Sequence, residues 1–252
     1  MPDAVDAIRS SAGRLTALVR PLTDDGIVQP AYPREWTIAD VLSHLGSGSV
    51  IAQRTVADTL SGATTPDNFN QVVWDEWNAK SPRNKVDDGL SEIDALVAQV
   101  GAVPDADRAR FAVALGPFTL DWSGFLGMRL NEQLLHEWDV AVALDPSATL
   151  AADGTALIID NLHLIARVSA RPDGHSGTIT IATTDPERSL TLSISPQEVV
   201  LATVPSVDPD LSMPAEAFIR LIYGRLDTEH APATVSGDLG MLSELRSIYP
   251  GF

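Results

Sequence analysis

Apolar residues in the first half of the chain recur with the period of amphipathic helices. In residues 3–20 they are spaced three or four apart ahead of Pro21, as on a helix with one buried face. The same spacing is found in "REWTIADVLSHLGSGSVIAQRTVADTL", in parts of residues 69–101 around the breaker "SPRNK", and from Asp121 to Leu144, before Asp145-Pro146. Four such segments predict an antiparallel four-helix bundle. Thr37 and Asp40 are placed to form a capping box at the start of the second helix.

The pattern changes after "DPSATLAADG". A helix over "GTALIIDNLHLIARV" precedes two alternating β-type runs, "GTITIATTD" and "RSLTLSIS", which are joined by the turn "DPE". The remaining segments predict a strand over "EVVLATV", a helix over "PAEAFIRLIYGRL", a short strand over "ATVSG" and a final helix over "LGMLSELRSIY". We therefore expect an α+β protein, with a helical bundle in residues 1–150 and a smaller α/β domain in residues 151–252.

The charge balance narrows the range of partners. The chain of 252 residues has 34 acidic and 17 basic residues and a net charge of −17, so its field repels nucleic acid and anionic membrane surfaces. The first residues lack the pattern of a signal peptide, and no apolar run approaches the roughly 20 residues that span a bilayer. We expect a cytoplasmic protein with neither nucleic acid nor membrane as partner.

The absence of cysteine restricts the possible metal chemistry. With no cysteine in the sequence, thiolate zinc sites, iron–sulfur clusters and a cysteine nucleophile are excluded. Any metal must then be bound by nitrogen and oxygen, from the five histidines and the many carboxylates. Nitrogen and oxygen ligands suit zinc, and they also accept nickel, iron or manganese.

The stretch "NEQLLHEWDV" offers two such ligands. Glu132 and His136 are four residues apart, so on a helix both side chains point from one face. A catalytic zinc usually needs a third protein ligand, and His44 on the second helix is the natural candidate. Asp40 and Asp139, one turn from His44 and His136, are candidates to orient the two imidazoles. The alternative is a polar pair on a helix surface and a core histidine satisfied by one hydrogen bond.

Two motifs in combination carry a family resemblance. "WTIADVLSHL", followed later by "RLNEQLLHEWDVAVAL", resembles the motif pair of the mycothiol-dependent maleylpyruvate isomerase family of actinobacteria, which is related to DinB-like metal enzymes. The residues that carry this resemblance are Trp36, Asp40, His44, Arg129, Glu132, His136, Trp138 and Asp139. The resemblance implies a DinB-like bundle with a divalent metal, usually zinc, on a His, Glu, His set, here His44, Glu132 and His136. It also implies a sterol-carrier-like C-terminal domain.

The resemblance further implies a low-molecular-weight thiol, mycothiol, as cofactor. A free thiol is mostly protonated at neutral pH, whereas coordination to zinc deprotonates it. The resulting thiolate could isomerise a maleyl-type substrate or be transferred to a small-molecule electrophile, as in an S-transferase. Two alternatives stay open: a hydrolase in which the metal activates water, and a binding protein that holds a small ligand unchanged.

A cation near the reacting groups would bind a carboxylate or stabilise a developing enolate. Arg129 lies on the same predicted helix as Glu132 and is one catalytic candidate. Arg225 is a second, and Arg220 and Arg225 are candidates for binding the thiol cofactor, because "FIRLIYGRLD" is similar to a family helix that ends in Gly-Arg. The alternative for each is an arginine in an ordinary ion pair, an interpretation favoured for Arg220.

Overall fold

The computed structural model describes residues 3–33, 35–116, 118–205 and 208–251. The chain divides into two compact units, Met1–Ala148 and Thr149–Phe252, and each is described by itself. None of the described helices is both long and apolar enough to cross a membrane.

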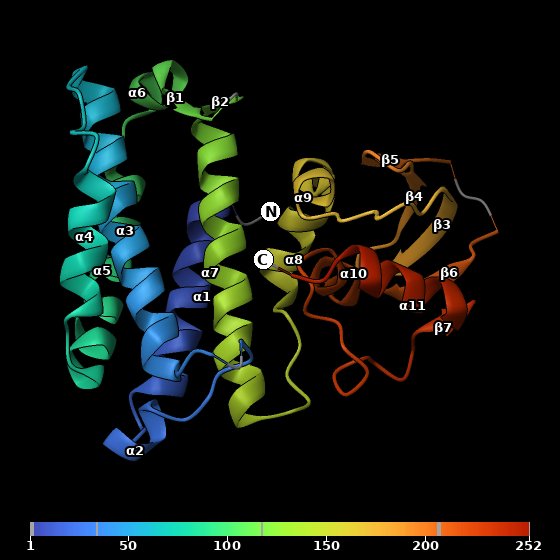
Figure 1. Ribbon diagram of the computed structural model, residues 1–252. Helices are drawn as coiled ribbons and strands as arrows, with labels where there is room; N and C mark the ends of the chain where they lie inside the picture. The colour runs from blue at the N-terminus through green and yellow to red at the C-terminus, as the bar shows by residue number, and fades with distance from the viewer. Residues whose placement is uncertain (1–2, 34, 117, 206–207, 252) are drawn as a thin grey trace. The chain divides into compact units, whose positions relative to one another are not determined.

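The first unit is built around a bundle of four long helices, which confirms the predicted architecture (Figure 1). Helix α1 contacts α5 and α7, and α3 contacts α5 and α7, so the four helices enclose one core. Shorter helices and a two-stranded hairpin complete the unit. Its elements are α1 (Ala4–Val19), α2 (Asp24–Ile27), α3 (Ile38–Ser61), α4 (Phe69–Asn78), α5 (Pro82–Ala102), α6 (Asp105–Arg110), β1 (Ala112–Leu115), β2 (Phe118–Asp121) and α7 (Trp122–Leu144).

The capping box at the start of α3 forms as the sequence predicts. The Thr37 hydroxyl accepts a hydrogen bond from the backbone N–H of Asp40 at 3.2 Å, and the Asp40 carboxylate accepts one from the backbone N–H of Thr37 at 3.1 Å. Two N–H groups that a helix end leaves unpaired are thereby satisfied. The cap fixes where α3 begins, and so the turn on which His44 lies.

The segment 69–101 contains two helices. "SPRNK" marks the start of the second one, because the Ser81 hydroxyl accepts from the backbone N–H of Asn84 at 3.3 Å and Pro82 occupies the first turn. The short helices α2 and α6 and the hairpin β1–β2 were not predicted. Each is only four to six residues long, too short for a periodic pattern to identify.

Close packing of α4 against α3 depends on Gly46. A Cβ at Gly46 would lie 2.2 Å from the Trp77 ring and 2.8 Å from the Cα of Gly89 on α5. We expect Gly46→Ala to lower the free energy of unfolding by about 1–3 kcal/mol through overpacking. Gly13→Ala on α1 is the control, since a Cβ there meets nothing within 4 Å, and it should stabilise by up to about 1 kcal/mol. Denaturant unfolding measures both, and a Gly46→Ala variant as stable as the parent would contradict this packing.

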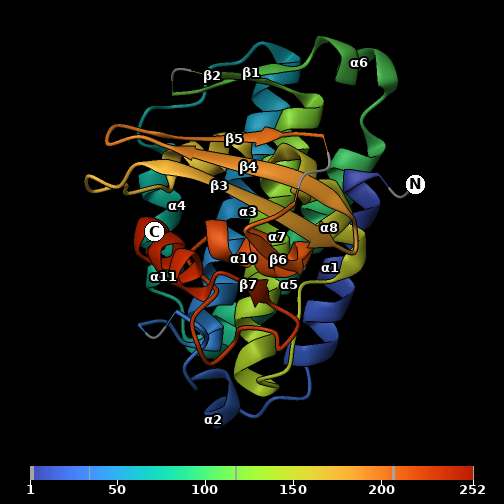
Figure 2. The same ribbon diagram turned by 90° about the vertical axis from the view of Figure 1, so that its right-hand side faces the viewer.

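The second unit contains a five-stranded sheet with helices packed on it, as predicted for an α+β protein (Figure 2). The strand order is β5-β4-β3-β6-β7, with β3 and β6 parallel and the other neighbours antiparallel. Helix α9 contacts β5, α10 contacts β3 and β6, and α11 contacts β6. The elements are α8 (Ala152–Ile158), η1 (Ile159–Asn161), α9 (His163–Val168), β3 (Gly177–Thr184), β4 (Arg188–Ile194), β5 (Val199–Thr203), β6 (Leu211–Pro214), α10 (Ala215–Ile222), β7 (Ser236–Gly237) and α11 (Leu239–Ile248).

Two segments of this unit differ from expectation. "GTALIIDNLHLIARV" is divided into α8, η1 and α9 instead of forming one helix. Strand β6 was not predicted, although its buried Leu211 and Met213 alternate with half-buried neighbours. Pro214 ends this strand and therefore precedes α10, whereas the sequence suggested that it lay in the first helical turn.

Candidate metal centre

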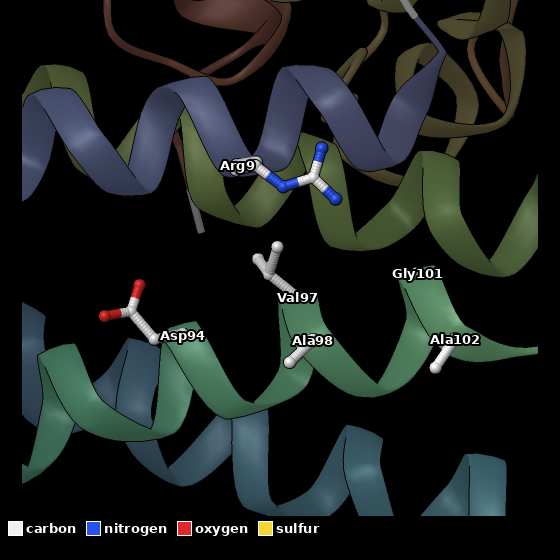
Figure 3. A pocket seen from close by; sticks show the side chains of 6 residues that line it. All are labelled: Arg9, Asp94, Val97, Ala98, Gly101 and Ala102. Carbon is white, nitrogen blue, oxygen red and sulfur yellow. The ribbon is translucent and has the colours of Figure 1, made fainter.

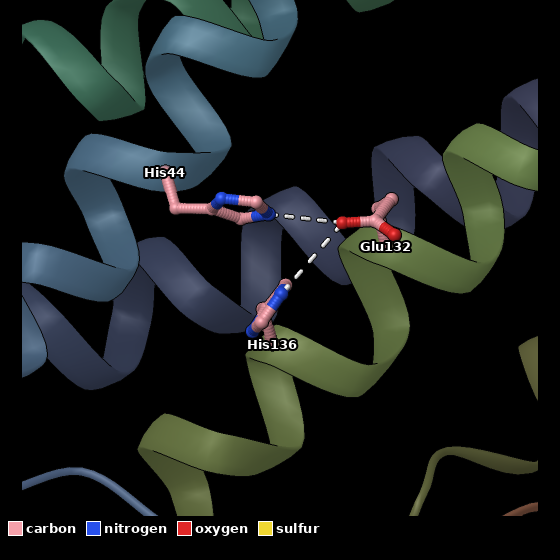
Figure 4. A group of neighbouring side chains, drawn as sticks. All are labelled: His44, Glu132 and His136. Carbon is pink, nitrogen blue, oxygen red and sulfur yellow. Dashed lines mark hydrogen bonds and ion pairs between the residues drawn. The ribbon is translucent and has the colours of Figure 1, made fainter. Parts of the chain in front are cut away.

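Helices α3 and α7 bring together the three side chains proposed as ligands (Figure 4). His44 Nε2 lies 3.0 Å from Glu132 Oε2, and His136 Nε2 lies 3.7 Å from the same oxygen. One ligand atom from each residue lies within 4.8 Å of the other two. His44, Glu132 and His136 are the one group of three or more potential ligands found among the described residues.

The imidazole of His136 is held by Asp139. Its Nδ1 lies 2.8 Å from Asp139 Oδ2, and the Asp139 side chain is fully buried. With the carboxylate as acceptor, Nδ1 carries the proton and Nε2, which faces Glu132, keeps its lone pair free for a ligand bond. The partnership suggested by the sequence spacing is therefore present, and it is typical of metal-binding histidines.

We expect Asp139→Asn to weaken metal binding by about 10- to 100-fold, the usual effect of removing a carboxylate that orients a ligating histidine. Asp227→Asn is the matched control, because Asp227 contacts Nδ1 of His230 at the same 2.8 Å but in the second unit. Chelator competition measures the metal affinity of both variants. If the two variants bind metal with equal affinity, Asp139 does not support a metal ligand.

Asp40 does not take the corresponding position beside His44. Its carboxylate accepts from Lys85 Nζ at 2.8 Å and from Thr37 Oγ1 at 2.7 Å. Burial would raise the pKa of Asp40, but the hydrogen bonds from Lys85 and Thr37 and the charge of Lys85 hold that pKa below its usual value. The sequence-based role of Asp40 as an orienter of His44 is replaced by a helix cap and an ion pair.

Glu132 is strongly biased toward its charged form. Burial alone would raise its pKa, but the hydrogen bond with His44 and the charges of His136, His44 and Arg129 outweigh burial and lower the pKa to about 2. A carboxylate that stays ionised in a half-buried position is suited to bind a cation. A tetrahedral metal with bonds of about 2 Å holds its ligands roughly 3.3 Å apart, close to the 3.0 and 3.7 Å separations measured here. The two distances to the Glu132 oxygen therefore fit a divalent metal, and the two histidine nitrogens lie within 4.8 Å of each other.

Arg129 extends from α7 one turn before Glu132. Its guanidinium lies over Gly48 of α3, where a Cβ would be 3.2 Å from Nη1. Its buried Nε has no hydrogen-bond partner in the described part of the chain. Burial lowers the pKa of Arg129, while the negative charge of Glu132 acts in the opposite direction. A half-buried cation with an unused donor close to Glu132 is equipped to bind an anionic group.

The other two candidate arginines belong to the second unit. Arg220 is 1% exposed; its Nε and Nη2 donate to the Glu216 carboxylate at 2.7 and 2.9 Å, and its Nη1 donates to the carbonyl of His230 at 2.9 Å. Arg225 is half-buried and follows Gly224, whose φ of +67° suits glycine. Arg225 Nη1 donates to the carbonyl of Tyr223 at 3.2 Å.

A cavity of about 300 Å³ opens beside His44. We call it the tryptophan pocket. Contacts of the α4 region could not be predicted from the sequence, although two tryptophans three residues apart on one short helix indicate a shared face. Its lining residues are Glu35, Trp36, Asp40, Ser43, His44, Ser47, Trp74, Trp77 and Asn78.

A second hollow, of about 550 Å³, lies between α1 and α5 (Figure 3). Its lining is mostly small or apolar and contains no histidine. The residues are Arg9, Asp94, Val97, Ala98, Gly101 and Ala102. It therefore offers no counterpart to the nitrogen ligands beside the tryptophan pocket.

Fold and site together define a helical-bundle protein with a candidate metal centre and a C-terminal α+β domain. The chain belongs to the mycothiol maleylpyruvate isomerase family: the family's N-terminal domain matches residues 8–141, and its C-terminal domain matches residues 149–244. The resemblance seen in the sequence motifs is thereby confirmed.

Two solved structures share the fold, and two curated proteins match part of the sequence. The crystal structure of the mycothiol-dependent maleylpyruvate isomerase matches with a TM-score of 0.67 at 13% identity, covering 95% of this chain and 97% of that one. A histidine-to-alanine mutant of that isomerase matches with the same TM-score at 12% identity and the same coverage. At these identities the likeness shows the fold. Uncharacterized proteins from two strains of Mycobacterium tuberculosis are 25% identical over 148 residues, which are 59% of this chain and 71% of theirs.

Proposed function

We propose that the protein is an enzyme that binds a divalent metal, zinc, on His44, Glu132 and His136 and uses it to activate mycothiol. The thiol then isomerises a maleyl-type substrate or is transferred to a small electrophile. The observation that carries the proposal is the convergence of three ligand atoms within 4.8 Å, two from α7 and one from α3. Membership in a family defined by mycothiol-dependent isomerisation supports the thiol as cofactor.

The ligand set leaves room for the thiol. Three protein ligands are the usual number for a catalytic zinc, whose remaining position is open. A zinc ion held there would supply a Lewis-acidic position at which a thiol loses its proton at neutral pH. The buried Asp139 keeps the His136 ring in one orientation. Trp36 lies beside both imidazoles, with ring centroids 5.2 Å from His44 and 5.9 Å from His136, and shields one side of the site.

Arg129 is the cation we assign to the reacting groups. It sits one turn from Glu132 and has an unused buried donor, so it can bind a substrate carboxylate or an enolate as negative charge develops. We assign Arg225 to binding the thiol cofactor. Arg220 would support it from within the second unit, since Arg220 Nη1 lies 3.4 Å from the carbonyl of Arg225.

Calorimetry with mycothiol on the zinc-loaded protein tests the proposal. We expect binding by the parent and at least about tenfold weaker binding by His44→Ala, because the metal loses one of its three ligands. His230→Ala, which alters a histidine of the second unit, should bind mycothiol as the parent does. Absence of mycothiol binding by the metal-loaded parent would refute the thiol function, and turnover without any thiol would favour a hydrolase.

A further inference from the structure

The tryptophan pocket lies directly against the candidate metal centre. His44 belongs to its lining, and Trp36 forms a wall that it shares with the two imidazoles. Its volume of about 300 Å³ is at the lower end of the range of small-molecule sites, roughly 300–1,000 Å³. A ligand group held in this pocket would therefore lie next to whatever binds at His44, Glu132 and His136.

Three tryptophans determine the surface of the pocket. Trp77 is 3% exposed and packs its ring against the Cα of Gly46, so that wall is fixed by the helix packing of α3 and α4. Trp74 is 45% exposed and forms the rim. Large indole faces offer apolar area and favourable ring–ring contacts to a flat ligand.

The charges around the pocket disfavour anions. Its lining includes the carboxylates of Glu35 and Asp40 and, among the described residues, no lysine or arginine. The two nearby lysines are already paired: Lys85 with Asp40 and Lys80 with Asp88, each at 2.8 Å. Lys80 Nζ also lies over the Trp77 ring, 3.8 Å from its centroid. A carboxylate entering here would find both lysines engaged by other carboxylates.

A net attraction for cations is also weak. Lys85 compensates the charge of Asp40, and Glu35 is exposed, so its charge is screened by solvent. Charge of either sign is therefore less suited to the pocket than an uncharged ring.

We propose that the tryptophan pocket binds an uncharged aromatic group of the electrophile and selects against a carboxylate at that position. That the ligand is an electrophile rests on the proposed function; that the pocket binds an uncharged ring does not. Asp40, His44 and Gly48 lie one turn apart along one face of α3. Asp40 and His44 line the tryptophan pocket, whereas Gly48 lies beside Arg129. Arg129 over Gly48 is the place for negative charge, and the tryptophan pocket is the place for the ring.

Three probes that share one ring system test the pocket: naphthamide, naphthoate and naphthylmethylammonium. Titrated into the zinc-loaded protein by calorimetry, naphthamide should bind at least about tenfold more tightly than naphthoate and more tightly than the ammonium compound. Equal binding of naphthoate and naphthamide, or tighter binding of the ammonium compound, would overturn the proposal.

Variants locate the binding and test its charge preference. Trp74→Ala should weaken naphthamide binding about tenfold, whereas Val72→Ala should not, because Val72 is exposed on the same helix but does not line the pocket. Glu35→Lys should strengthen naphthoate binding about fivefold at low salt by supplying a counterion. If Trp74→Ala binds all three probes as the parent does, the pocket assignment is wrong.

The same protein samples separate this proposal from the function it extends. Mycothiol binding should be unchanged in Trp74→Ala, because Trp74 is not one of the three candidate metal ligands. A parent that binds naphthamide through Trp74 but never binds mycothiol would refute the thiol function and leave the aromatic site standing. A parent that binds mycothiol but not naphthamide would refute the aromatic site and leave the thiol function standing.

Discussion

His136→Ala should purify with less than about a tenth of the metal that the parent holds, and its metal affinity should fall at least about 100-fold. The two remaining candidate ligands, His44 and Glu132, come from different helices, and a pair of ligands does not make a catalytic zinc site. Elemental analysis after dialysis measures the bound metal, and chelator competition measures the affinity. Thiol-dependent turnover should fall with the metal content.

Loss of metal must be separated from loss of fold, because His136 is 8% exposed and its removal leaves the buried Asp139 without this partner. His136→Ala/Asp139→Asn also removes the buried charge of Asp139 and should recover stability without recovering metal. His230→Ala changes a histidine that also pairs with an aspartate, at 2.8 Å, in the second unit. If His136→Ala holds as much metal as the parent, His136 is not a ligand. This conclusion does not depend on the stability of the double variant.

The main features of the fold follow from periodicity and from local signals. The apolar spacing predicted the long helices α1, α3 and α7, and the capping box of Thr37 and Asp40 fixed the start of α3 to the residue. These features depend on residues within a few positions of one another, and a single sequence displays them directly. The alternating strands β3 and β4 were predicted for the same reason.

The candidate site was predictable where its parts lie on one helix. Glu132, His136 and Asp139 are neighbours by helical spacing, so the sequence predicted their proximity. The helix cap formed by Asp40 with Thr37 was predicted, because the two residues are three apart. The ion pair of Asp40 with Lys85, 45 residues away, was not predicted. Local spacing does not show which residue of another helix will bind a side chain.

The tryptophan pocket shows the same limit. Its walls come from α4 and from residues 35–47, and they meet because Gly46 lets the Trp77 ring approach α3. A glycine within a helix has many explanations in a sequence, and only the packed structure shows which one applies. The fragmentation of "GTALIIDNLHLIARV" into α8, η1 and α9 is likewise hidden, because apolar periodicity continues across the breaks.

In the second unit, Arg220→Met should lower the free energy of unfolding by about 3–5 kcal/mol, the usual cost of removing one partner of a buried ion pair. Arg220 is 1% exposed and holds Glu216 through two hydrogen bonds, while its Nη1 satisfies the His230 carbonyl. Without the guanidinium, the Glu216 carboxylate, in a residue 7% exposed, loses this counterion. Denaturant unfolding followed by circular dichroism measures the change.

The control is Arg188→Met, which also removes an arginine with two hydrogen bonds to one carboxylate, here Asp160 at 2.6 and 2.7 Å. Those side chains are 31% and 50% exposed, so solvent screens the pair and the expected cost is at most about 1 kcal/mol. Arg220→Met/Glu216→Leu should recover most of the stability lost in Arg220→Met, because it removes the unpaired charge together with its partner. If Arg220→Met costs no more than Arg188→Met, the buried pair does not stabilise this unit.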